Sequence, residues 1–195
     1  MHKPTPRRLI VGMSGASGAI YGIRILQALQ GSGIETHLVM SESARITLAS
    51  ESDMTGPEVE ALATEVHHVR NIGATVSSGS FKTMGMVIAP CSIRTLSEVA
   101  WGGTGSLLTR AADVVLKERR RLVLMLRETP LHAGHLKSML QATDNGAIVM
   151  PPVPAFYTRP KTIDDIVNHS VGRVLDLFDI ETDLVERWAG LGQRS

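Results

Sequence analysis

Small and hydroxyl-bearing residues follow two apolar runs, in positions where they could hold a phosphate or another anion. The stretch VGMSGASGAIYG, residues 11–22, contains four glycines, and APCSIRT, residues 89–95, supplies the hydroxyls of Ser92 and Thr95. Where a strand leads into a helix through such a loop, free backbone N–H groups and the helix dipole favour an anion. The glycines predict that the first loop lets a ligand approach the backbone closely, and a phosphate is the expected ligand.

The spacing of the first loop excludes two common nucleotide-binding motifs. Its glycines stand at positions 12, 15 and 18, and no Lys-Ser/Thr pair follows them, so it is not a Walker loop. The next apolar run ends in Met40-Ser41, without the acidic residue that would bind the ribose of NAD. The sequence therefore disfavours NAD. The hydroxyl of Ser17 could alternatively do no more than cap the following helix.

Cationic side chains could neutralise a bound phosphate. Arg110 and Lys117 are seven residues apart in a helical pattern, so they share a face and could clamp an anion. The alternative is a solvated helix face on which Asp113 pairs with Lys117. Arg127 directly follows an apolar run, where functional side chains gather in parallel sheets. Arg173 lies within an apolar helical pattern and would need a partner if it were buried.

The sequence gives little support for thiol or metal chemistry. Cys91 is the single cysteine, so it forms no intramolecular disulfide, and no histidine is near it in sequence to activate it as a nucleophile. No CxxC or HExxH motif is present, and His67-His68 is predicted on a polar helix face, so we expect no metal site. If the substrate is a phosphate ester, cationic side chains must take the place of a metal.

Apolar runs and helical patterns alternate along the chain, which predicts an α/β fold with a parallel sheet and helices on both faces. Three loops, 12–17, 89–95 and 127–130, should then meet at the carboxyl ends of the strands. Four prolines exclude a helix from residues 151–160. Strands are predicted at 8–13, 35–40, 85–90, 122–126 and 147–150. Helices are predicted at 19–33, 41–50, 56–69, 92–102, 106–120, 135–146 and 162–178.

Length and charge limit the classes of protein. The 195 residues suit one domain spanning 1–195, with a core over about 8–188. The 20 basic and 19 acidic side chains give a net charge of +1, which does not indicate nucleic acid as a partner. No run reaches the ~20 apolar residues that a membrane span requires. We expect a soluble, cytoplasmic protein.

Five segments, taken in order, resemble the flavin prenyltransferases of the UbiX type. They are GMSGASGAIYG, APCSIRTLS, LLTRAADVVLKERRRLVL, RETPLHAGHL and PPVPAFYTRP. The resemblance covers the chain from Arg8 to about Trp188 and implies a flavodoxin-like, three-layer fold that binds FMN. It also implies a metal-independent reaction in which dimethylallyl passes from dimethylallyl monophosphate to N5 and C6 of reduced FMN, which is a substrate.

The resemblance further implies partners for the protein. The prenylated FMN would serve a decarboxylase of the UbiD type, in ubiquinone synthesis or in the decarboxylation of aromatic acids. The chain would assemble as a homododecamer with sites between subunits.

The family's functional positions can be carried over residue by residue. Those that match FMN contacts are Gly15, Ala16, Ser17, Ser41, Ser92, Ile93, Arg94, Thr95 and Arg127. Those that match contacts to the prenyl phosphate or polar groups around it are Tyr157, Arg173, Arg110, Lys117 and Glu128. Ser17 and Glu51 match residues implicated in proton handling, which makes Ser17, Glu51, Lys117 and Glu128 the expected catalytic set. Glu51 could instead be a solvated residue at the end of a helix.

Two other functions remain open from the sequence. An FMN-dependent decarboxylase could act directly on a small acid by means of the same fold and loops. A non-catalytic FMN-binding subunit could carry flavin for a separate decarboxylase. The choice between a monophosphate and a diphosphate donor is also open.

Overall fold

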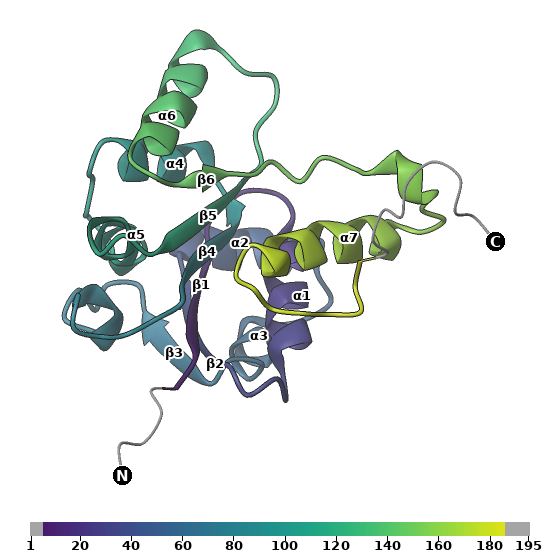
Figure 1. Cartoon of the computed structure of the whole chain (residues 1–195), viewed down its shortest axis with the longest axis horizontal. Helices are drawn as coiled ribbons and strands as arrows, with labels where there is room; N and C mark the ends of the chain where they lie inside the picture. Colours follow the sequence, from purple (N-terminus) through teal and green to yellow (C-terminus); the bar gives the residue numbers. More distant parts are fainter. Residues whose placement is uncertain (1–5, 186–195) are drawn as a thin grey trace.

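A six-stranded, fully parallel sheet forms the centre of the protein. The computed structural model describes residues 6–185, and the strand order is β3-β2-β1-β4-β5-β6 (Figure 1). The strands are β1 (Arg8–Met13), β2 (Glu35–Met40), β3 (Glu65–His68), β4 (Gly85–Cys91), β5 (Arg121–Leu126) and β6 (Ile148–Val149). The residues of β4 are all buried, as expected for a central parallel strand covered on both faces.

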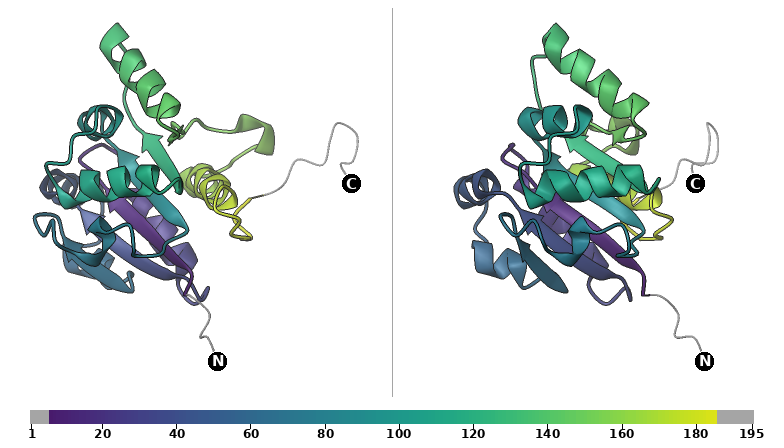
Figure 2. Two further views of the ribbon diagram at one scale, coloured as in Figure 1. Left: turned by 60° about the vertical axis from the view of Figure 1, so that its left-hand side comes forward. Right: turned by 90° about the vertical axis from the view of Figure 1, so that its left-hand side faces the viewer.

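Helices cover both faces of this sheet and make three layers (Figures 1 and 2). One face carries α1 (Ala19–Leu29), α2 (Glu42–Glu51), α3 (Gly56–Glu60) and α7 (Ile163–Asp176). The other carries α4 (Ile93–Ala100), α5 (Leu107–Lys117) and α6 (Ala133–Asp144). Two 3-10 turns, Thr75–Ser77 and Phe156–Thr158, lie in the connections. Among the described residues, no helix is long and apolar enough to cross a membrane.

Strand alternation divides the apolar side chains between two cores. Leu9 and Val11 of β1 pack in the core under α1 and α7, whereas Ile10 packs in the core under α4 and α5. This is the period of two that strands impose on their side chains. The predicted α/β architecture with helices on both faces is confirmed.

Residues 56–69 do not form the single helix that their pattern predicts. Thr55 and Glu58 form a capping box that starts α3, but the helix ends at Glu60, and residues 65–68 add β3 to the edge of the sheet. Pairing with β2 outweighs the local helical pattern here. His67 is therefore a strand residue with 7% of its surface exposed, which also corrects its predicted place on a polar helix face.

The added edge strand completes a doubly wound sheet. The order 3-2-1-4-5-6 reverses direction between β1 and β4, and without β3 the remaining strands have the 2-1-3-4-5 order of flavodoxin. The flavodoxin-like prediction is thus confirmed, with one strand more than expected. Ligands of such sheets bind at the reversal point, beyond the carboxyl ends of the strands. The end of the predicted core, residues 186–188, lies outside the described residues.

Candidate functional site

The side chain of Ser14 joins two of the three predicted loops at the carboxyl ends of the strands. It is 2% exposed, its hydroxyl donates to the carbonyl of Pro90 (3.0 Å), and it accepts the N–H of Ser92 (2.7 Å). The third loop joins them because the N–H of Arg127 donates to the carbonyl of Cys91 (3.0 Å). The predicted rim of loops is confirmed. Sequence reasoning missed Ser14, although its place directly after a buried strand was the available signal.

The glycines of the first loop make room for the protein itself. A Cβ at Gly15 would lie 2.4 Å from Cβ of Ser43 on α2, and one at Gly22 would lie 2.4 Å from the carbonyl oxygen of Ala89. Gly18 has a φ of 104°, which side-chain-bearing residues rarely adopt. Close packing against neighbouring elements of the chain is therefore one reason for these glycines, and their contact with a ligand stays a prediction.

A carboxylate already occupies the N-terminus of α1. Oε2 of Glu51, the last residue of α2, accepts the N–H groups of Gly18 (2.7 Å) and Ala19 (3.2 Å). Gly18, not Ser17, is the N-cap residue of α1. Because glycine has no side chain, the N-cap residue itself supplies no side-chain hydrogen bond to the helix start. The simple capping role for Ser17 is therefore wrong, and the carboxylate that accepts the N–H groups at this helix start is that of Glu51.

Glu51 also joins Ser17 and Arg127 in one polar cluster. Partial burial would raise the pKa of Glu51, but hydrogen bonds from the Ser17 hydroxyl and the two backbone amides, with the Arg127 charge, bring it below its ordinary value. Burial raises the pKa of Tyr21, against the opposing effect of the Arg127 charge. Glu51 is thus an exposed residue at the end of α2, and hydrogen bonds hold its carboxylate at the start of α1. Three predicted site residues meet here, and Tyr21 is an addition that the sequence analysis missed.

The second loop presents hydroxyls at the start of α4. Ser92 is the N-cap residue, and its Oγ accepts the N–H of Thr95 (3.3 Å) and donates to Oγ1 of Thr95 (3.1 Å). Arg94 extends from the first turn with 87% of its side chain exposed and pairs with Glu98 (2.9 Å). Ile93 is half-buried against the core below. This helix start is the part of the rim best suited to an incoming anion.

Ser41 attaches the second strand to the same rim. Its N–H donates to the carbonyl of Met13 (3.0 Å), and its Oγ accepts the N–H of Ala44 (3.0 Å) as the N-cap of α2. Oγ of Ser41 lies 3.1 Å from Oγ of Ser43, which in turn packs against Gly15. Ser41 and Gly15 therefore both contact Ser43, which brings them close together, as their predicted role in binding FMN requires.

Cys91 is sealed inside the protein. It is fully buried at the end of β4, and burial raises the pKa of its thiol far above the ordinary value. A neutral, inaccessible thiol is a poor nucleophile. The structure agrees with the sequence-based view that Cys91 is inert.

The predicted phosphate-binding residues on α5 stand apart from this rim cluster. Arg110 pairs with Asp113 (2.8 Å), and Lys117, at the opposite end of the helix from its N-cap, pairs with Glu118 (2.6 Å). The alternative prediction of a solvated helix face paired Asp113 with Lys117, whereas Asp113 pairs with Arg110 in the structure. Glu128 lies on the third loop, where its carboxylate accepts the N–H of Thr129 (3.1 Å).

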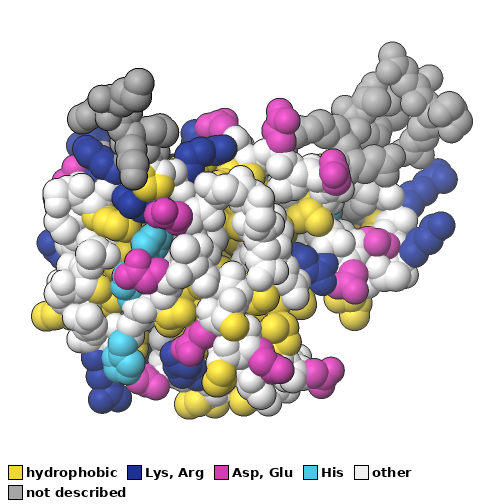
Figure 3. Space-filling view, turned by 90° about the horizontal axis from the view of Figure 1, so that it is seen from below, with side chains coloured by type: hydrophobic (Ala, Val, Ile, Leu, Met, Phe, Trp, Pro, Cys, Tyr) yellow, Lys and Arg dark blue, Asp and Glu magenta, His cyan; other side chains and the backbone are white. Residues whose placement is uncertain are grey.

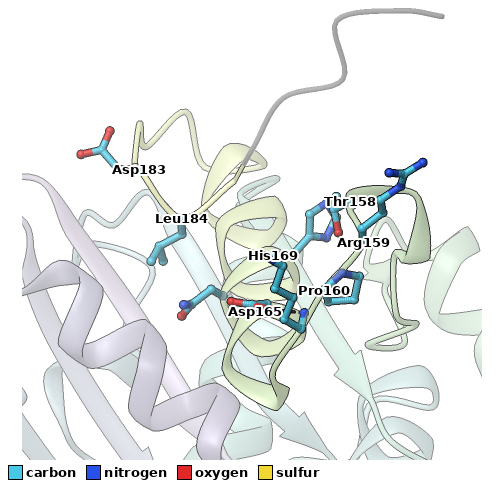
Figure 4. A pocket seen from close by; sticks show the side chains of 9 residues that line it. Thr158, Arg159, Pro160, Asp165, His169, Asp183 and Leu184 are labelled. Carbon is cyan, nitrogen blue, oxygen red and sulfur yellow. Dashed lines mark hydrogen bonds between the residues drawn. The ribbon is translucent and has the colours of Figure 1, made fainter. Parts of the chain in front are cut away.

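The remaining predicted residues lie on α7 and the segment before it. The hydroxyl of Tyr157 is 3.1 Å from Nε2 of His169, and Arg173, one helical turn beyond His169, pairs with Asp176 (2.7 Å). Burial and the Arg173 charge both lower the pKa of His169. Residues 158–161, α7 and residues 183–184 enclose a hollow of about 410 Å³, on which the side chains of His169 and Asp165 border (Figure 4).

The sequence-predicted site residues therefore form three groups in one chain. The rim group joins Gly15, Ser17, Ser41, Glu51, Ser92 and Arg127 through direct contacts and carries Ala16, Ile93, Arg94, Thr95 and Glu128 on its loops. The α5 group (Arg110, Lys117) and the α7 group (Tyr157, Arg173) belong to helices on opposite faces of the sheet.

The fold and this rim are those of a flavin-binding class of proteins. The family model described as Flavoprotein matches residues 1–175, so the chain belongs to the flavoprotein family. Within it, the chain belongs with the flavin prenyltransferases. It is 63% identical to Flavin prenyltransferase UbiX of Thauera aromatica over 96% of each chain, and 62% identical to that of Escherichia coli K12 over 94% of this chain and 99% of the relative. The resemblance seen in the sequence is confirmed.

Two solved structures agree with this assignment. The crystal structure of AnUbiX (PadA1) in complex with FMN and dimethylallyl pyrophosphate is 50% identical, with a TM-score of 0.94 over 95% of this chain and 99% of that one. A dodecameric FMN-dependent UbiX-like decarboxylase from Escherichia coli O157:H7 is 49% identical, with a TM-score of 0.92 over 94% of this chain and all of that one.

Proposed function

We propose that this protein transfers a dimethylallyl group from dimethylallyl monophosphate to N5 and C6 of reduced FMN. The observation that carries the proposal is the rim at which Glu51, Ser17 and Arg127 meet beside the start of α4. Relatives more than 60% identical over almost the whole chain are named flavin prenyltransferases, and one solved relative is described with FMN and a dimethylallyl donor.

The residues of the rim fit FMN bound across the point where the strand order reverses. Because Glu51 holds the start of α1, the phosphate of FMN belongs at the start of α4, with the hydroxyls of Ser92 and Thr95 and the extended side chain of Arg94. Arg127 and Glu51 then border the isoalloxazine ring. Prenylation supplies a modified flavin to a decarboxylase of the UbiD type.

The chain's own groups would supply the catalytic charge without a metal. Departure of phosphate from an allylic ester leaves negative charge on the leaving group, which Arg110, Lys117 and Arg173 can neutralise. The hydroxyl of Tyr157 can donate to the same group. Glu51, whose carboxylate is hydrogen bonded to Ser17, would accept the proton released at C6. Removal of one cationic contact should slow the reaction about a hundredfold, or roughly 3 kcal/mol.

The proposed site needs more than one chain. Arg110 and Lys117 lie on the face of the sheet opposite Arg173, so a neighbouring chain must supply one of the two groups. The segment before α7 and the first residue of α7 expose large apolar side chains, with Phe156 73% and Ile163 80% exposed, as an assembling surface would. A homododecamer like that described for the E. coli relative is the assembly we propose.

Mass spectrometry of the released flavin tests the proposal. Purified protein would be incubated anaerobically with FMN, a reductant and dimethylallyl monophosphate, and separately with the diphosphate. We expect the flavin to gain one isoprene unit with the monophosphate. A gain only with the diphosphate would keep the prenyltransferase and change the donor, whereas unmodified FMN with both donors would contradict the proposal.

Variants separate catalysis from flavin binding. Lys117→Ala and Tyr157→Ala should abolish most of the prenylated product and leave the affinity for FMN nearly unchanged. A flavin carrier would deliver flavin equally well in either variant. A direct decarboxylase would release CO₂ from a small acid with no second enzyme present.

A further inference from the structure

Three metal-ligating side chains converge on the edge of the sheet, away from the flavin rim. His37 is in the first half of β2, Glu65 opens β3, and His67 follows two residues later on the same strand. His37 and Glu65 are direct partners in the register of these strands. Nδ1 of His37 lies 3.0 Å from Nε2 of His67, and carboxylate oxygens of Glu65 lie 3.4 Å from the first nitrogen and 3.7 Å from the second.

We propose that His37, Glu65 and His67 bind one divalent transition-metal ion, and that Zn²⁺ fits this ligand set best. Two imidazole nitrogens and a carboxylate are ligands that zinc takes, with bonds of about 2.0–2.2 Å. Ligand atoms at that distance from a tetrahedral ion lie about 3.4 Å apart. The three separations in the structure lie around this value, so an ion fits between the ligand atoms after small side-chain rotations.

Burial and local charge both suit a cation at this point. His37 and His67 are 3% and 7% exposed, so their rings are held in place, while Glu65 opens to solvent and leaves a path for the ion. Arg8 pairs with Glu35 nearby (2.7 Å), so these two charges cancel. The carboxylate of Glu65 then gives the surroundings of the site a net charge of −1. Seen from below, histidine and acidic side chains lie side by side on this face (Figure 3).

Burial favours the neutral form of the two imidazoles, which ligation requires. It lowers the pKa of His37 and of His67, against the opposing effect of Glu65. In the metal-free protein the facing nitrogens share one hydrogen bond. Ligation replaces that hydrogen bond and puts the proton of the His37 ring on Nε2. This nitrogen is buried and has no hydrogen-bond partner, and the His37 ring meets Phe81 edge to face.

The site is independent of the proposed prenyl transfer. It lies within the sheet on β2 and the edge strand β3, whereas the flavin rim lies at the carboxyl ends of β1, β4 and β5. The ion would hold the edge strand β3 against β2. An ion with this structural role takes no part in the proposed prenyl transfer. That reaction still depends on cationic side chains.

Calorimetric titration with Zn²⁺ tests the site on the full, untagged chain after dialysis against EDTA. We expect one ion per chain for the wild type, at least tenfold weaker binding for Glu65→Gln, and loss of binding for His67→Gln. Glu65 is half-exposed, so its variant keeps the fold even where His67→Gln does not. The titration contains neither flavin nor prenyl donor, so its result does not depend on the proposed function.

Matched controls exclude adventitious histidine contacts. His68 is the exposed neighbour of His67 on the same strand, and the rings of His132 and His135 lie 3.6 Å apart at the start of α6. His68→Gln and the double variant His132→Gln/His135→Gln should bind Zn²⁺ as the wild type does. The proposal is overturned if the wild type takes up no ion, if Glu65→Gln binds as tightly as the wild type, or if the His132/His135 variant abolishes binding.

Discussion

Glu51 stabilises the start of α1 from a distance of more than thirty residues in the chain. Its carboxylate accepts the N–H groups of Gly18 and Ala19 and the hydroxyl of Ser17. In Glu51→Gln the amide oxygen can still accept one of these bonds, but the negative charge at the positive end of the helix is lost. We expect the free energy of unfolding at pH 7 to fall by about 1 kcal/mol. Urea denaturation measures the difference, and Glu181→Gln, an exposed change outside the helices, serves as the control.

The same substitution makes a prediction for pH. The folded state lowers the pKa of Glu51 below its ordinary value of 4.5, so the charged carboxylate contributes stability above that pH. The contribution disappears as the pH falls through the lowered pKa. The gap between wild type and Glu51→Gln should therefore be constant from pH 8 to pH 5 and narrow as the pH falls below 4.5. A gap that persists undiminished at the lowest pH would mean that the charge is not what stabilises the helix.

The contact between α1 and β4 determines how close the first two loops of the rim lie. Gly22 faces this strand, and a Cβ there would lie 2.4 Å from the carbonyl oxygen of Ala89 and 2.9 Å from the side chain of Met13. Alanine has about 1 kcal/mol more helix propensity than glycine, but a clash with backbone costs up to about 3 kcal/mol. We expect Gly22→Ala to destabilise the protein by about 1–2 kcal/mol.

Displacement of α1 should also weaken flavin binding, because Ala89 precedes the carbonyl that Ser14 contacts. Chemical denaturation and an FMN titration measure the two effects. Gly105→Ala is the control, since a Cβ at Gly105 meets open space. Equal stability of the two variants would show that α1 can move aside without cost.

The alternation of strands and helices was predictable because each element carries its own pattern. The apolar run Arg8–Met13 and the capped helix after Thr162 form where the sequence predicts them. β3 was not predictable, because only its pairing with β2 makes residues 65–68 a strand. The same reason hid Glu51 as the cap of α1 and His67 as a neighbour of His37, since both contacts join residues far apart in the chain.

The residues proposed to bind the phosphate are on opposite faces of the sheet, which predicts that the phosphate site is shared between chains. Lys117 lies on α5 and Arg173 on α7, on opposite faces of one sheet, so we expect each complete site to combine residues of different chains. Lys117→Ala and Arg173→Ala should each be nearly inactive alone. When the two variants are co-expressed and assemble at random, about a quarter of the sites should contain both wild-type residues.

Restored activity in the mixed assembly would come from these hybrid sites alone. The matched control co-expresses the single variants Lys117→Ala and Arg110→Ala. Both residues are on one helix, so they reach a site from the same chain. No site in that mixture holds both wild-type residues, so its activity should stay at the level of the single variants. The measurement is prenylated flavin per chain by mass spectrometry. Equal activity in the two mixtures would contradict a site shared between chains, since the opposite placement of α5 and α7 would then have no consequence for catalysis.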